Sequence, residues 1–151
     1  MKALLVIDVQ KGYMERYGRD LLTAINSRID EAVSKNELLI YVKNVRHLKS
    51  GNVINEFAED LAVRSSNIIH KEQASVFDND DLTALLREHD VTEVEVIGID
   101  GCCCVARSAE DAKALGYTVT MPCAYIGVKN AARFEKKKAQ LEKLGVGVDP
   151  R

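Results

Sequence analysis

The 151-residue chain contains no tryptophan, two prolines, nine glycines and only 5% aromatic residues. So little proline and glycine excludes collagen-like and low-complexity chains, and a hydrophobic fraction of 46% excludes global disorder. No apolar run approaches the roughly 18 residues that a transmembrane helix needs. Asp8 interrupts the first apolar run before a signal-peptide core would end. We therefore expect a soluble, cytoplasmic protein without a membrane partner.

Charge of one sign is also lacking, because 21 basic and 23 acidic residues leave a net charge of −2. This balance does not resemble the basic surface of a nucleic-acid-binding protein. The basic run Glu135–Lys143 is typical of a solvated helix face. The length suits one domain, residues 1–151, with a core that needs no disulfides.

Short apolar runs alternate with longer amphipathic stretches along the whole chain. Strands are predicted at Ala3–Val9, Leu38–Val42, Asn67–His70, Val94–Ile99, Tyr117–Met121 and Val146–Val148. Helices are predicted over Leu21–Val33, from an Asp80 cap through Leu86, over Val105–Leu115 and over Asn130–Leu144. This alternation favours an α/β fold, a parallel sheet with helices on both faces.

Ligands of such sheets bind beyond the carboxyl ends of the strands, so the residues that close each strand are candidates. Asp8 ends a buried strand, where a carboxylate costs several kcal/mol unless it is paired. It either caps the following turn or serves as a general base. Lys71 ends another strand and is either solvated or paired with Asp8, where it would also lower the pKa of a nearby thiol.

Three of the four cysteines are consecutive, at Cys102, Cys103 and Cys104. A disulfide framework would space them along the chain, so the cluster indicates a reducing compartment and thiol chemistry. Cys104 falls where a helix begins, and the helix dipole there favours the thiolate. Backbone N–H groups of the same turn could hold an oxyanion. Cys102 and Cys103 fit the role of small apolar fillers.

Metal and cofactor motifs are missing from the sequence. His47, His70 and His89 are scattered, and no Cys-x-x-Cys or G-x-G-x-x-G motif is present. Cys102 and Arg107 have the spacing of a sulfurtransferase loop, but the run between them lacks the glycines that let amides curl around an anion. We keep a sulfurtransferase as a minor alternative and expect no cofactor and no metal.

Three segments resemble, in order, those of the isochorismatase-like cysteine hydrolases, which include nicotinamidases and related amidases. ALLVIDVQKGY carries the family's first Asp at Asp8, and IIHKEQASVF aligns Lys71, Ser75 and Phe77 with a Lys-x-x-x-Ser-x-Phe segment. IGIDGCCCVARSAEDAKALGYTV resembles the nucleophile segment, in which Cys-Val-x-x-Thr/Ser-Ala-x-Asp-Ala precedes a Gly-Tyr strand start. Only Cys104 fits that register, so the resemblance selects it as the nucleophile.

The resemblance implies a Rossmann-like three-layer α/β/α sandwich with a six-stranded parallel sheet and an Asp8–Lys71–Cys104 triad. It implies hydrolysis of a C–N bond in a small amide through a thioester, by a homo-oligomer (dimer or tetramer). A cis peptide is expected at Ile99–Asp100. The turn and oxyanion residues would be Ile99, Asp100, Gly101 and Cys103, and the substrate pocket would include Tyr13, Phe77 and Cys123.

Several positions depart from the family pattern. Gly101 and Cys102 stand where members often have Thr and then an acidic or amide residue, and Cys123 stands where they often have Asp. The Asp-x-His of metal-binding nicotinamidases falls on Val45 and His47, so the resemblance also implies no metal. True isochorismatases act on a vinyl ether without a nucleophilic cysteine, so a cysteine here favours an amidase.

These departures keep two other functions open. An altered family member could be a binding module for a small molecule or a protein. The vicinal cysteines could instead have a redox role.

Overall fold

The computed structural model describes residues 1–45 and 56–149. Its strands are β1 (Lys2–Ile7), β2 (Leu38–Asn44), β3 (Ile68–Lys71), β4 (Glu93–Ile99), β5 (Thr118–Pro122), β6 (Ile126–Gly127) and β7 (Gly147–Asp149). Its helices are α1 (Arg19–Ser34), α2 (Asp80–Glu88), α3 (Cys104–Ala114) and α4 (Ala131–Lys143), with short 3-10 helices at Met14–Arg16, Val76–Asp78 and Cys123–Tyr125. Among the described residues, no helix is both long and apolar enough to cross a membrane.

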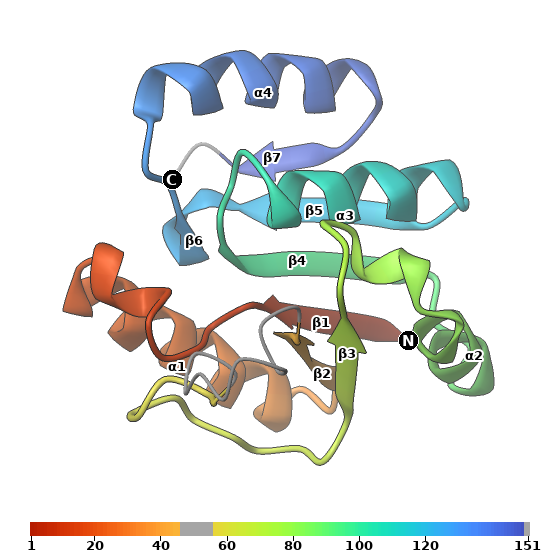
Figure 1. Cartoon of the computed structure of the whole chain (residues 1–151). Helices are drawn as coiled ribbons and strands as arrows, with labels where there is room; N and C mark the ends of the chain where they lie inside the picture. The colour runs from red at the N-terminus through yellow and green to blue at the C-terminus, as the bar shows by residue number, and fades with distance from the viewer. Residues whose placement is uncertain (46–55, 150–151) are drawn as a thin grey trace.

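The strands pair in parallel in the order β3-β2-β1-β4-β5-β7, and β6 adds a short pairing on β4 (Figure 1). The sheet therefore has seven strands, one more than expected. β5 pairs with β4 only from Thr118 to Thr120, and β6 pairs with β4 further along, at Gly98 and Ile99. A two-residue strand has no periodicity that sequence reasoning could detect.

Helices cover both faces of the sheet, which confirms the three-layer α/β/α architecture (Figure 1). Leu5 and Ile7 of β1 face the core under α2, α3 and α4. Leu4 and Val6 face the opposite core, formed with α1 and the segment 57–62. Because successive side chains of a strand point to opposite faces, a strand covered on both sides reads as one continuous apolar run.

The strand order reverses between β1 and β4, which are direct neighbours. Ile7 pairs with Gly98, so the segments that follow both strands leave the sheet side by side. Gly98 has a φ of +113°, and a Cβ there would collide with the backbone of Ile7, so only glycine fits this close approach. The expected cis peptide bond, Ile99–Asp100, follows directly and is confirmed. This reversal is where ligands of open α/β sheets bind.

Side-chain caps determine where helices α2 and α4 begin. Asn79, and not Asp80 as expected, caps α2, because its side chain accepts a hydrogen bond from the Asp81 N–H. Asn130 caps α4 in the same way, through the Arg133 N–H. Asp80 is instead the first helical residue, where its negative charge interacts favourably with the positive end of the helix dipole.

Candidate active site

Asp8 and Lys71 form a buried ion pair at the carboxyl ends of the strands. Asp8 directly follows β1 with a φ of +56°, and its N–H donates to the Val42 carbonyl at 3.0 Å. Lys71 ends β3, and its side chain is 0% exposed. Its Nζ lies 3.1 Å from Asp8 Oδ2, although β2 separates the two strands in the sheet. The pairing compensates the cost of burying both charges.

Cys104 completes this cluster from the first residue of α3. Its Sγ lies 3.3 Å from Lys71 Nζ, which also donates to the Gln73 carbonyl at 3.0 Å. The ammonium of Lys71 thus contacts a carboxylate, a thiol and a carbonyl. The three residues that the sequence singled out come together from three separate segments.

The thiol of Cys104 rests in its protonated form. Burial, the charge of Asp8 and a hydrogen bond to Asp8 together raise its pKa to about 11, and Lys71 only partly opposes them. The expected bias toward thiolate at the helix start is therefore wrong for the resting protein, because desolvation and the carboxylate outweigh the positive charges nearby. A nucleophile in this state needs a base, and the Asp8 carboxylate is in contact with it.

Asp100 anchors the turn that precedes Cys104. Its carboxylate accepts hydrogen bonds from the Cys102 N–H (2.8 Å), the Tyr17 hydroxyl (2.9 Å) and the Lys129 N–H (3.0 Å). Burial and the hydrogen bond to Asp100 raise the pKa of Tyr17 well above its usual range, so it remains a donor. One side chain thus ties the turn to the loops after β1 and β6.

The backbone of this turn narrows the choice of oxyanion donor. The N–H groups of Cys103 and Val105 both donate to the Asp100 carbonyl at 3.1 Å. The Cys103 N–H, expected to hold an oxyanion, is therefore already engaged. Among the described residues, no backbone carbonyl accepts from the Cys104 N–H, which leaves it as the donor closest to the nucleophile.

A cavity of about 260 Å³ opens beside the triad. Of the residues expected at the site, it is lined by Asp8, Tyr13, Ile99, Asp100, Cys103 and Cys104. Tyr17, Asn44 and Lys129 also line it. Asn44 is the last residue of β2, and strand ends are where ligands of parallel sheets bind. Tyr17 lies in the segment after β1, as Tyr13 does. Lys129 had no signal in the sequence, since it follows the undetected strand β6.

Phe77 and Cys123 do not line this cavity, which corrects the expectation for both. The Phe77 N–H donates to Ser75 Oγ, and the ring packs against Tyr117 at a centroid distance of 6.2 Å in the core. Cys123 begins a 3-10 helix and packs into the same core, with Lys138 of α4 among its nearest charges. Both side chains are thus partly buried against the core and lie outside this cavity.

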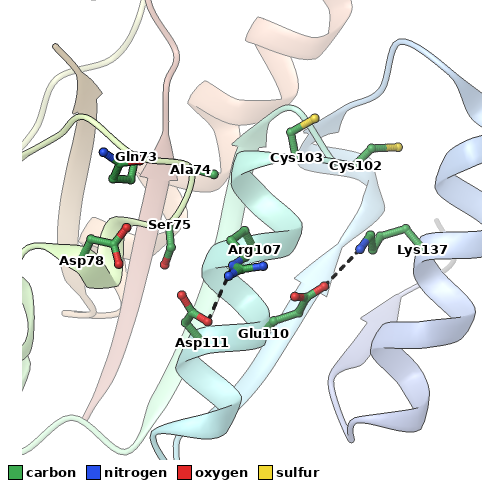
Figure 2. Close-up of a pocket in the computed structure, with 10 residues that line it drawn as sticks. All are labelled: Gln73, Ala74, Ser75, Asp78, Cys102, Cys103, Arg107, Glu110, Asp111 and Lys137. Atoms are coloured by element: carbon green, nitrogen blue, oxygen red, sulfur yellow. Dashed lines mark hydrogen bonds and ion pairs between the residues drawn. The ribbon is translucent and has the colours of Figure 1, made fainter. Parts of the chain in front are cut away.

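Cys102 and Cys103 border a second cavity, of about 410 Å³, whose lining residues are drawn in Figure 2. Figure 2 shows their thiols at one end of it, with Arg107 on α3 below them. Cys102 packs against the core as a filler would, whereas Cys103 is exposed and lines both cavities. The filler interpretation therefore fits Cys102 and is wrong for Cys103. On the wall of this cavity, Lys137 Nζ forms an ion pair with Glu110 Oε1 at 3.2 Å.

Packing explains why position 101 is glycine. A Cβ on Gly101 would lie 2.8 Å from the ring of Phe134 and 3.0 Å from methyl groups of Ile126 and Val128. Helix α4 thus occupies the space that a threonine side chain would need.

The residues present do not fit the metal site of metal-binding nicotinamidases. Val45 stands at the position of the acidic ligand, and its apolar side chain cannot coordinate an ion. His47, the other position considered, lies outside the described residues. Over residues 1–45 and 56–149, no three His, Cys, Asp or Glu side chains gather closely enough to hold a metal.

Comparisons with known proteins agree with this fold. The family model of the isochorismatase domain matches residues 2–142. The structure is similar to the pyrazinamidase of Pyrococcus horikoshii in complex with zinc (22% identity, 97% of each chain covered, TM-score 0.85). It is similar to a nicotinamidase of Staphylococcus aureus (22% identity, 99% of this chain and 98% of that chain, TM-score 0.86).

An N-carbamoylsarcosine amidase from Thermoplasma acidophilum has the same fold, at 16% identity, with 98% of this chain and 95% of that chain covered and a TM-score of 0.84. A search of curated proteins finds no significant match. Identities this low show the fold alone, whereas the family model spans nearly the whole chain. The chain therefore belongs to the isochorismatase family of hydrolases.

Proposed function

We propose that this protein is a cysteine amidase, which cleaves a C–N bond of a small amide through a thioester. One observation carries the proposal: Lys71 Nζ lies 3.1 Å from Asp8 Oδ2 and 3.3 Å from Cys104 Sγ, beside a cavity that the last two residues line. A base, a cation and a nucleophile in mutual contact are what acyl transfer to a thiol requires.

Acylation begins with proton transfer from Cys104 to Asp8. The sulfur then attacks the amide carbonyl, and the carbonyl π electrons move onto oxygen to form a tetrahedral oxyanion. The Cys104 N–H donates to that oxyanion, a contact worth about 3–4 kcal/mol in measured oxyanion holes. Lys71 stabilises the carboxylate before the transfer and the sulfur's negative charge during it.

Collapse of the tetrahedral intermediate completes acylation. The carbonyl re-forms and the C–N bond breaks while Asp8 gives its proton to the leaving nitrogen, which frees the amine or ammonia and leaves the thioester. Deacylation follows. Asp8 then accepts a proton from a water molecule, whose oxygen attacks the thioester carbonyl. The C–S bond breaks, the acid leaves, and the proton returns to Cys104.

A panel of small amides assayed for ammonia release tests this function. Cys104→Ala should lower kcat/KM by about 10⁴-fold or more, as removal of a nucleophile does elsewhere. Cys123→Ser is the matched control, because that thiol lies outside the catalytic cavity. Full activity in Cys104→Ala would contradict the mechanism. If the wild type cleaved no amide of the panel but bound one of them in calorimetry, a binding module would be the better assignment.

A further inference from the structure

The charges that line the catalytic cavity differ in how far they are compensated. Asp8 is paired with Lys71. The Asp100 carboxylate accepts three hydrogen bonds, two of them on Oδ2 and one on Oδ1. Both acids are therefore engaged by protein groups, which leaves the cavity poorly suited to a cationic ligand.

Lys129 is the exception among these charged groups. It is exposed at the edge of the cavity, and none of the ion pairs between described residues includes it. Its backbone is fixed by the hydrogen bond to Asp100, and its ammonium lies 6.0 Å from the centroid of the Tyr17 ring. Arg16 adds a second positive charge near Tyr17. Lys129 thus brings a positive charge to the mouth of the cavity, on a backbone that its hydrogen bond to Asp100 anchors.

From this arrangement we infer that the substrate is a small amide that carries a carboxylate, which Lys129 binds at the mouth while the amide carbonyl faces Cys104. This inference rests on the proposed function. The cavity of about 260 Å³ is smaller than the roughly 300–1,000 Å³ that accommodate drug-sized ligands, so the substrate is small. Monoamides of short dicarboxylic acids and N-carbamoyl amino acids have this chemistry.

Matched substrate pairs test the inference: succinamate and N-carbamoylglycine, each against its methyl ester. The ester keeps the amide and removes the charge. At low salt the wild type should prefer at least one acid over its ester by about tenfold in kcat/KM, because the ester lacks the negative charge that strengthens a hydrogen bond from Lys129. Salt at about 0.5 M should reduce the preference, since the pair lies at an exposed mouth.

Lys129→Met should remove this acid-over-ester preference, mainly through KM, and Lys129→Arg should restore it. Lys136→Met is the matched control: it removes the same charge from an exposed position of α4 that lines neither cavity, and should leave the preference unchanged. A wild type that treats both acids like their esters would overturn the inference, as would a preference that survives in Lys129→Met.

Binding separates this inference from the proposed function. Calorimetry with Cys104→Ala measures the affinity for succinamate and N-carbamoylglycine without turnover. If the wild type cleaved no amide but either acid bound, and binding weakened about tenfold in Cys104→Ala/Lys129→Met, the amidase proposal would fail and the carboxylate site would stand. If the wild type cleaved uncharged amides only, the amidase would stand and the carboxylate site would fail.

Discussion

Two buried clusters of charge lie toward opposite ends of the same sheet. Toward the amino end, Arg28 of α1 donates from Nε to Glu95 at 2.7 Å and from one Nη to both oxygens of Glu37, at 2.6 and 2.8 Å. Lys2 adds a further contact to Glu95 at 2.9 Å. At the carboxyl end, Lys71 joins Asp8 and Cys104.

The two clusters differ in whether they include a reactive group. Burial alone would lower the pKa of Arg28, but its hydrogen bonds to Glu95 and Glu37 raise it above the ordinary value, so this guanidinium is permanently charged and held by two acids. The carboxyl-end cluster includes a thiol that can lose its proton, and a cavity adjoins it. A buried ion pair by itself therefore indicates stability at most, and a reactive third group beside a cavity indicates chemistry.

After Cys104→Ala, the largest effect is expected from Asp8→Asn, which should lower kcat/KM by about 10²–10⁴-fold, because it removes the general base. The same change should speed alkylation of Cys104 at pH 8, since both the charge of Asp8 and its hydrogen bond raise the thiol pKa. Mass spectrometry of Cys104 labelled with iodoacetamide, beside the amide assay, measures both. Slower alkylation together with slower turnover would contradict the assigned role.

Arg28→Met addresses the other cluster. It leaves Glu37 and Glu95 buried without their partner, so the free energy of unfolding should fall by about 3–5 kcal/mol in urea titrations. Arg64→Met, which breaks an exposed pair with Asp30, should cost less than about 1 kcal/mol. The alkylation rate of Cys104 in folded Arg28→Met should equal that of the wild type; a changed rate would mean that the clusters are coupled.

Gly101→Thr tests the packing behind the nucleophile turn. The new Cβ would meet the Phe134 ring, so the variant should lose about 1–3 kcal/mol of stability. Combined with Phe134→Leu, the loss should be smaller than the sum of the two single effects. Additive effects in this double-mutant cycle would show that Phe134 is not what requires the glycine.

The smallest effect concerns pH. The folded pKa of Cys104 is about 11, above its ordinary 9.0, so folding favours the thiol. The resulting stability is fully present below pH 9 and is lost as the pH rises toward 11. The stability of the wild type relative to Cys104→Ala should therefore decline across that window in urea titrations. A difference that rises with pH would indicate a thiolate in the resting protein.

Much of the fold could be predicted because helices and strands follow from the local spacing of apolar residues. The six predicted strands and four predicted helices all exist in the structure, with boundaries shifted by a few residues. The exceptions are features without a periodic signal: the two-residue β6, the three short 3-10 helices and the Asn79 cap of α2. At the site, the spacing of the motifs selected Cys104 from three adjacent cysteines, and Asp8 and Lys71 lie in contact with it or with one another.

By itself, then, the sequence determined the layers of the sandwich, since burial patterns and strand ends are local properties of a chain. Its resemblance to the cysteine hydrolases selected the three residues that meet at the carboxyl end of the sheet. Only the tertiary structure decided what surrounds them. It placed Tyr17 and Lys129 in the wall of the cavity and packed Phe77 and Cys123 against the core. Those placements depend on how loops distant in sequence pack together. The protonation of the nucleophile depends likewise on burial and on charges summed in three dimensions.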